Sequence, residues 1–477
     1  MVGWILLGLF VLFFAVILTR AALFVPAKTQ PVTAEAVAIN QEKIVADMAA
    51  MVRCKTVSYR DHSLEDAAEF AKFADLLKER FPLVHGACQV EHIGRNGLLY
   101  LLQGQAHDAP TVCMAHYDVV PAEAAAWEHS PFCGEVIDGC LWGRGTLDTK
   151  STLCGVLEAL EALLATGYTP MQDLYLSFSG EEEIDGETCA EIVTFLQQKG
   201  VNPALVLDEG GAVVENVFPG VTAPCAVIGI AEKGSVNLNF TLQSKGGHAS
   251  TPPTHTVLGQ LSRAVTRIEA KPFKMQLTPP AAKMFDTLGR HSRFALKILF
   301  ANLWCFKPLL DLVGRLSGGE LNAMLRTTLA VTRMQGSDAY NVLPPKASFG
   351  VNMRLLGQDT IDSAIAHLKK AVKNKDIAVE VVSGMHPSIV SDTQCAGYQT
   401  LCRAIRQTWP EALISPYLMM ACSDSRHYCR LCDRVYRFSP MALSKAQRAS
   451  IHGHNESIPL ETLYKIVIFY THLLREL

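Results

Sequence analysis

The stretch Thr-Val-Cys-Met-Ala-His-Tyr-Asp at residues 111–118 decides the fold, because an apolar run there ends in polar side chains. Two later stretches repeat the pattern: Leu174–Phe178 leads into three glutamates, and Ala204–Leu207 leads into Asp208. Short continuous apolar runs are typical of buried strands. Residues 151–165, between the first two runs, predict a helix. Buried strands that alternate with helices predict a mostly parallel sheet in an α/β fold.

The polar residues that follow these strands are of the types that bind metal ions. His116, Glu181–Glu183 and Asp208 each follow a predicted strand, and open α/β sheets bind ligands beyond the carboxyl ends of their strands. A Gly-rich segment with Asp148 and a C-terminal segment with His452 carry the same chemistry. Taken singly, the glutamates could begin a helix and Asp208 could cap one. Together, these imidazoles and carboxylates predict a site for Zn²⁺ or a related divalent ion.

The middle of the chain has a different pattern of apolar and polar residues. Residues 236–242, 347–354 and 378–382 alternate apolar with polar side chains, which predicts half-exposed antiparallel strands. We therefore expect an inserted module over 233–385 between two pieces of an α/β domain, 40–232 and 386–477. In the first piece, residues 64–80 predict an amphipathic helix, with Ser63 and Asp66 as its capping box.

The N-terminus predicts a membrane segment. Val2–Thr19 contains no charge and approaches the ~20 residues that span a bilayer. We expect a single-pass anchor, with a cleaved signal peptide as the alternative. Arg20 and Lys28 follow the span and favour a cytosolic body. Residues 294–313 are also apolar, but charges and a proline interrupt them, so we expect an apolar helical lid or a covered surface there.

Composition excludes several classes of protein. The 477 residues are 49% hydrophobic, which excludes a disordered chain, and their number predicts about three domains. Lys and Arg total 43 against 46 Asp and Glu, so no basic excess indicates nucleic-acid binding. The 14 cysteines do not form a disulfide framework pattern. The absence of a GxSxG motif disfavours a serine nucleophile.

Four motifs, in this order, resemble the M20 family of dinuclear zinc exopeptidases and amidohydrolases: His116-Tyr-Asp-Val-Val-Pro121, Gly143-Arg-Gly-Thr-Leu-Asp-Thr-Lys150, Glu182-Glu-Ile-Asp-Gly186 and His452-Gly-His-Asn-Glu456. The closer resemblance is to the carboxypeptidase S branch, which includes secreted enzymes that make and hydrolyse N-fatty-acyl amino acids. This resemblance implies a parallel-sheet catalytic domain with an inserted α+β lid, which forms the dimer contact in the family.

The resemblance also implies a role for each site residue. His116 and Asp208 would bind one zinc, Glu183 and His452 the other, and Asp148 would bridge the two. Asp118 would orient the imidazole of His116. Glu182 would be the general base that takes a proton from a bridging water.

Substrate residues follow from the same resemblance. His248 would help to hold the oxyanion, in family dimers from the partner chain, although a turn histidine is the plainer interpretation. Asn341 and Arg354 would contact the substrate, with a surface strand arginine as the alternative for Arg354. Ser423 and Arg426 would lie in the substrate loop, where Cys422 and Ser423 depart from the residues usual in the family.

The expected protein is thus a membrane-anchored amidohydrolase with two zinc ions. It would cleave the amide of a peptide or an N-acyl amino acid that ends in a free carboxylate. The resemblance favours an extracytoplasmic catalytic domain and a homodimer, and the segment 294–313 suggests a pocket for an acyl chain. The alternatives are an aminoacylase or dipeptidase of the same family and a non-catalytic member acting as a receptor or scaffold.

Overall fold

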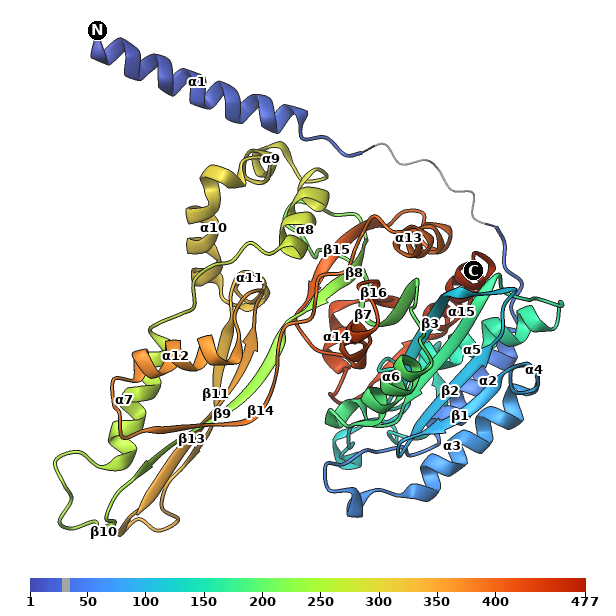
Figure 1. Cartoon of the computed structure of the whole chain (residues 1–477), viewed down its shortest axis with the longest axis horizontal. Coiled ribbons are helices and arrows are strands. Elements are labelled where there is room, and N and C mark those ends of the chain that lie inside the picture. Colours follow the sequence, from blue (N-terminus) through green and yellow to red (C-terminus); the bar gives the residue numbers. More distant parts are fainter. Residues whose placement is uncertain (28–34) are drawn as a thin grey trace.

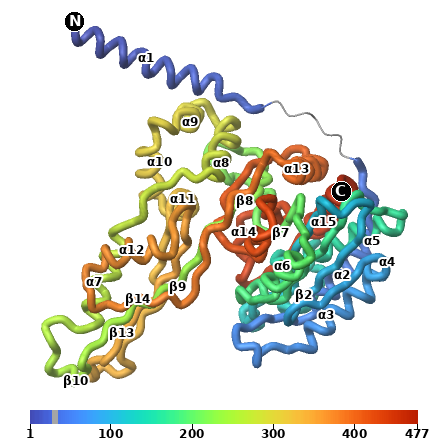
Figure 2. The backbone as a smooth tube through the Cα atoms, in the orientation of Figure 1, coloured from blue at the N-terminus to red at the C-terminus, as the bar shows by residue number. Residues whose placement is uncertain are grey.

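The computed structural model describes residues 1–27 and 35–477; Lys28 lies outside the described residues. It contains an N-terminal helix, a large α/β body and a smaller elongated sheet (Figure 1). The tube view shows the small sheet reaching away from the large body to a narrow tip (Figure 2).

Within the described residues, eight strands form the large sheet in the order β1-β2-β6-β3-β7-β16-β8-β15. The central run β6-β3-β7-β16 is parallel, as is the outer pair β8–β15, whereas β1, β2 and β6 pair antiparallel. The predicted α/β class is confirmed, with antiparallel pairings on both sides of the central run, β2 with β6 and β8 with β7 and β16. The strands are β1 Gln89–Ile93, β2 Gly97–Leu102, β3 Ala106–His116, β6 Gln172–Ser179, β7 Leu205–Val214, β8 Cys225–Glu232, β15 Leu413–Met419 and β16 Val435–Leu443.

Helices cover both faces of this sheet because its central strands are apolar on both sides. In β3, Cys113 and Ala115 face one core, and Val112 and Met114 face the other, as the two-residue period of a strand requires. The first face is covered by α2 Gln41–Val52, α5 Lys150–Leu164, α13 Ala396–Thr408 and α15 Leu460–Arg475. The second is covered by α6 Thr188–Gln198 and the 3₁₀ turn η4 Asp424–Arg430.

The helix predicted over 64–80 begins three residues later than expected. It is α3 Ala67–Arg80, and Asp66 caps it by accepting a hydrogen bond from the Ala68 amide (3.1 Å). Ser63 lies instead in a separate 3₁₀ turn, η1 His62–Leu64. The remaining short elements of this body are α4 Pro82–Ala87, β4 Glu135–Ile137, β5 Cys140–Trp142, β17 Ser457–Pro459, α14 Lys445–Ser450, η2 Ala124–Ala126 and η3 Glu182–Ile184.

The smaller sheet has the order β11-β13-β9-β14, all antiparallel. Its strands are β9 Gly234–Gln243, β11 Thr328–Gln335, β13 Lys346–Leu355 and β14 Ala378–Met385. Alternate side chains of β9 and β13 are buried, and they form a core with α7 Val257–Glu269 and α12 Ile361–Val372. At the far tip, β10 Gly247–His248 pairs with β12 Val342–Leu343.

One segment inside the expected module packs elsewhere. Each of the helices α8 Pro279–Gly289, α9 Phe294–Phe300, α10 Leu303–Ser317 and α11 Gly319–Leu325 contributes buried apolar residues to the core of the large sheet. The face of α8 that carries Phe285 and Leu288 accounts for this, because α8 packs against β15. Packing therefore divides the range 233–385, which was expected to be one module.

The N-terminal helix is α1 Val2–Leu23. It is long and apolar enough to cross a membrane, with a mean hydropathy of 2.7, and a signal sequence would share these properties. Only Ile17 and Ala21 of its residues are buried, where its second half contacts α9.

Candidate metal centre

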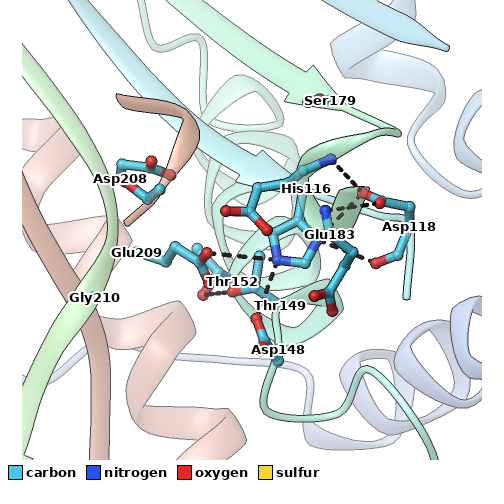
Figure 3. A network of polar contacts seen from close by, with 12 residues as sticks. His116, Asp118, Asp148, Thr149, Thr152, Ser179, Glu183, Asp208, Glu209 and Gly210 are labelled. Atoms are coloured by element: carbon cyan, nitrogen blue, oxygen red, sulfur yellow. Dashed lines mark hydrogen bonds and ion pairs between the residues drawn. The ribbon is translucent and has the colours of Figure 1, made fainter. Parts of the chain in front are cut away.

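The elements that carry the side chains expected to bind metal meet at the carboxyl edge of the parallel strands, and Figure 3 shows His116, Asp148, Glu183 and Asp208 there. His116 is the last residue of β3, and Glu182 and Glu183 begin the η3 turn just after β6. Asp148 precedes α5, and His452 follows α14. The sheet thus brings together residues that are more than 300 positions apart in the sequence.

Asp148 lies between the two imidazoles. Its Oδ1 is 3.0 Å from Nε2 of His116, and its Oδ2 is 3.0 Å from Nε2 of His452. The same nitrogen of His452 is 2.9 Å from Oε2 of Glu183. One carboxylate that serves two separate imidazoles has the geometry of a bridging ligand.

Two groups of donor atoms can be distinguished among the described residues, each with its ligand atoms within 4.8 Å of one another. The first is His116, Asp148 and Glu183, and the second is His116, Glu182 and Glu209. One carboxylate oxygen of Glu183, Oε1, is buried and has no hydrogen-bond partner among the described residues. A buried carboxylate oxygen without a donor fits a cation ligand, and mixed imidazole and carboxylate donors suit Zn²⁺.

Asp208, which the sequence predicts as a metal ligand, lies beside a second candidate carboxylate. Its Oδ2 accepts a hydrogen bond from the Ser425 amide (3.0 Å), and it belongs to neither donor group. The neighbouring Glu209 lies closer to the imidazole, with Oε1 3.5 Å from Nε2 of His116. Both residues lie inside β7, which continues to Val214, and the pairing of β7 with β16 shifts register between Asp208 and Gly211. The adjacent acidic residues Asp208 and Glu209 could have indicated two candidate ligands. The sequence does not show which of the two carboxylates lies closer to His116.

Asp118 is fully buried and organises the site from behind. Its backbone carbonyl lies 3.0 Å from Nδ1 of His116, and its carboxylate lies 3.4 Å from the same nitrogen. The carboxylate also accepts hydrogen bonds from the amides of Glu182 (3.2 Å) and Glu183 (3.1 Å) and from the Ser58 hydroxyl (2.7 Å). Asp118 therefore positions His116 and the glutamate pair together.

Glu456 is a further structural residue to which the sequence analysis gave no role. It is fully buried, and its Oε1 accepts hydrogen bonds from the amides of Leu147 (2.7 Å) and Asp148 (3.3 Å). Its Oε2 pairs with the buried guanidinium of Arg144 (2.6 Å). The only signal was its place in the last motif, four residues after His452. Glu456 fixes the turn that presents Asp148.

The crowding of carboxylates perturbs their acidity. Burial, with the charges of Glu209, Asp424 and Glu183, raises the pKa of Glu182 well above its usual value. Burial and the charge of Asp148 raise the pKa of Glu209 to about 8. For Asp148, burial is outweighed by the hydrogen bonds from the two imidazoles, so its pKa is lowered. Bonds to Asp148 and Glu183 raise the pKa of His452 to about 10.

Three of the expected substrate residues lie together beside this centre. Ser423 donates a hydrogen bond to Glu232 (3.0 Å), and Arg426 bonds back to the Ser423 carbonyl (2.7 Å). Nη1 of Arg426 is buried and has no hydrogen-bond partner in the described part of the chain. Arg354 reaches this loop from β13, with Nη1 3.2 Å from Sγ of Cys422. The loop thus holds two guanidinium groups close to Glu232 and Cys422.

His248 and Asn341 are not brought to the centre of their own chain. His248 is exposed on β10, and its Nδ1 lies 2.7 Å from the Ser250 hydroxyl. The Asn341 carbonyl accepts a bond from the Ala249 amide (3.0 Å), so the two residues are neighbours at the tip of the small sheet, far from the large body (Figure 1).

Comparison with known proteins places this geometry in a family. The model of the peptidase family M20/M25/M40 matches residues 112–476, which is more than half of the chain. The chain belongs to this family. An N-fatty-acyl-amino acid synthase/hydrolase PM20D1 from Xenopus tropicalis is 36% identical over 91% of this chain and 86% of that protein. A probable carboxypeptidase S-like 2 from Dictyostelium discoideum is 32% identical over 88% of this chain and 82% of that protein.

Solved structures agree on the fold. An M20 family metallo-carboxypeptidase from Sulfolobus solfataricus superposes with a TM-score of 0.67 at 14% identity, covering 91% of this chain and 98% of that one. The predicted family and its carboxypeptidase S-like branch are thereby confirmed. This M20 chain is a metallopeptidase or amidohydrolase that hydrolyses amide bonds.

Proposed function

We propose that this M20 hydrolase binds two Zn²⁺ ions per chain and cleaves the amide bond of N-acyl amino acids or of peptides at their C-terminus. His116 and Glu209 would hold one ion, Glu183 and His452 the other, and Asp148 both. The observation that carries the proposal is the position of Asp148, 3.0 Å from each imidazole. When bound, the ions would polarise the scissile carbonyl and acidify a water molecule.

Glu182 has the position and surroundings of the general base. Its carboxylate belongs to the donor group with His116 and Glu209. The next residue, Glu183, belongs to the other donor group, with His116 and Asp148. Its backbone amide is tied to Asp118, so the carboxylate is held at the centre by a buried contact. The carboxylate would take a proton from the attacking water and deliver it to the leaving nitrogen. Burial raises the pKa of Glu182, and a raised pKa makes its carboxylate a stronger proton acceptor.

The 423–426 loop supplies a way to recognise a substrate carboxylate. Arg426 keeps one buried N–H group that no described residue accepts, and Arg354 lies nearby at the end of β13. A guanidinium can bind a carboxylate through two parallel hydrogen bonds. We therefore assign carboxylate recognition to these two arginines, and the names of the relatives support an acyl amino acid as the substrate. His248 and Asn341 would act only if a partner chain in a homodimer placed them at the neighbouring centre.

The apolar helix α1 would anchor the enzyme in a membrane as a single span, with the catalytic body on the extracytoplasmic side. Two features support an anchor: the length and hydropathy of α1, and the polar contacts that join its end to the folded body. A cleaved signal peptide would not require such contacts. Detection of Val2–Thr19 in the mature protein by mass spectrometry tests this point.

Substitution of Glu182 by Gln tests the proposed chemistry. Loss of the base should lower kcat by about 10²- to 10⁴-fold, while bound zinc stays at the wild-type level. The exposed Glu187, five residues along the chain, provides a matched Glu→Gln control that should keep full activity. Full activity of E182Q would remove Glu182 from this role.

A series of N-acyl amino acids of increasing chain length, set beside short dipeptides, identifies the substrate class. Faster turnover of the long-chain acyl substrates supports the proposal. Preference for short dipeptides would support dipeptidase chemistry instead, and a lack of any hydrolysis would support a non-catalytic protein.

A further inference from the structure

The corner between α9 and α10 is joined to the end of α1 by buried polar contacts. The Arg20 guanidinium donates hydrogen bonds to the Ala301 carbonyl (3.0 and 3.2 Å) and to Oδ1 of Asn302 (3.1 Å). The fully buried Asn302 amide donates in turn to the Ile17 carbonyl (3.1 Å). These contacts fix the position of the corner relative to α1.

The corner also contacts α1 at a position nearer its N-terminus than Arg20. The ring of Trp304 meets the ring of Phe13 edge to face, with centroids 6.0 Å apart. Phe13 precedes Arg20 by seven residues, and a helix rises ~1.5 Å per residue, so Trp304 lies about 10 Å from the level of Arg20 toward the apolar end of α1. If α1 spans a bilayer, Trp304 lies within the apolar layer.

The α10 helix is amphipathic, and its apolar face is open. Leu309, Leu312, Val313 and Leu316 recur at the spacing of one helical face, and between 43% and 78% of each is exposed. The opposite face carries Leu310 and Gly314, which are buried against α11. Trp304 (56% exposed) and Phe294 (53%) extend the open face toward α1. Apart from the contact between Phe13 and Trp304, these side chains stay largely exposed among the described residues.

Basic residues are frequent in the segment that carries this apolar face: Arg290, Arg293, Lys297, Lys307 and Arg315. The nearby acids are already paired, Asp286 with Arg290 (2.9 Å) and Asp311 with Arg315 (2.8 Å) and the buried Arg326. An apolar helix face bordered by Lys and Arg is typical of helices that lie in the headgroup region of an anionic membrane.

We propose that the α9–α10 face, defined by Phe294, Trp304, Leu309, Leu312, Val313 and Leu316, is inserted in the lipid leaflet at the end of α1. The inference rests on the proposed anchoring by α1. The occupant is lipid because the face is continuous with a helix of membrane-spanning length and is fixed to it by Arg20 and Asn302. The helices in this apolar segment thus form a second membrane contact without a second span.

Quenching of tryptophan fluorescence by brominated lipid tests this arrangement in the full-length chain. Two variants, W4F and W304F, are reconstituted in nanodiscs of phosphatidylcholine and phosphatidylserine, with and without brominated phosphatidylcholine. In W4F the chain keeps four tryptophans, of which Trp127 and Trp409 are buried and only Trp304 is strongly exposed. Brominated lipid should quench the part of the W4F fluorescence that comes from Trp304. It should leave the fluorescence of the double variant W4F/W304F unchanged.

The W304F variant separates this inference from the anchoring on which it rests, because Trp4 of α1 then reports on bilayer insertion. Quenching of W304F with no difference between W4F and W4F/W304F would overturn lipid docking of the α9–α10 face and leave the anchor intact. Absence of quenching in both single variants would overturn both. If a second copy covers the face, Trp304 stays unquenched and the triple variant L309S/L312S/L316S changes from dimer to monomer, which also overturns the inference.

Discussion

The Arg144→Met variant tests whether the Asp148 turn depends on a buried ion pair. Arg144 and Glu456 are 2% and 0% exposed, and their charged atoms are 2.6 Å apart. Arg144 also donates to the Gly453 carbonyl (2.7 Å), which lies next to His452. Methionine keeps much of the apolar length of arginine but leaves the Glu456 carboxylate buried without its cation.

The magnitude follows from burial. Removal of one partner from a buried ion pair costs about 3–5 kcal/mol, because the remaining charge is left in a poorly solvating environment. The exposed pair Arg60–Asp185 has a similar length, 3.0 Å, but its side chains are 70% and 56% exposed. Pairs of that kind contribute less than about 1 kcal/mol. Arg60→Met is therefore the matched control.

Urea unfolding of the zinc-free variants measures both effects without a contribution from metal binding. Arg144→Met should lower the free energy of unfolding by about 3–5 kcal/mol, and Arg60→Met should stay close to wild type. Because Glu456 holds the amides of Leu147 and Asp148, zinc affinity should also fall by about 10- to 100-fold in Arg144→Met. Equal stability of the two variants would refute the reasoning, since burial would then not determine the cost.

Two further predictions concern carboxylates. Glu209→Gln should lower bound zinc from two ions to one per chain, whereas Asp208→Asn should retain both; elemental analysis that gave the reverse would restore Asp208 as the ligand. Burial raises the pKa of Glu158, which pairs with Lys43 (2.8 Å), from 4.5 to about 7. The folded protein therefore holds an extra proton between these pH values, and its stability should fall as the pH rises through about 7. Glu158→Gln should flatten this part of the urea stability profile, and an unchanged slope would contradict the assignment.

The sequence predicted the sheet well because its strands are buried on both faces. The run at 111–115 became the core of Ala106–His116, and the run at 174–178 became Gln172–Ser179. The choice between Asp208 and Glu209 as the metal ligand could not be made from the sequence pattern in the same way. It depends on which of the two carboxylates lies closer to His116, and the continuation of β7 through Gly210 to Val214 is not apparent from a pattern that resembles a strand end.

Tertiary packing explains the other differences. The alternating strands of the small sheet were recognisable because one of their faces is buried, but α8 carries an apolar face that fits either core. Only the contact with β15 assigns it to the large sheet. The apolar run at 294–313 likewise has two readings in sequence, a pocket or a covered surface, and the structure brings its central corner to α1 through Asn302.

The charge of the centre supports the proposal of two metal ions in place of one. Asp148, Glu182, Glu183 and Glu209 place four carboxylates around two imidazoles, and burial raises the pKa of each glutamate. An imidazole that ligates a metal is neutral, so it contributes no positive charge to balance these groups. A single dication would leave half of the carboxylate charge uncompensated in a poorly solvating crevice, whereas two dications balance all four carboxylates. The two imidazoles also lie 3.0 Å from different oxygens of Asp148, an arrangement that a carboxylate shared by two ions would need.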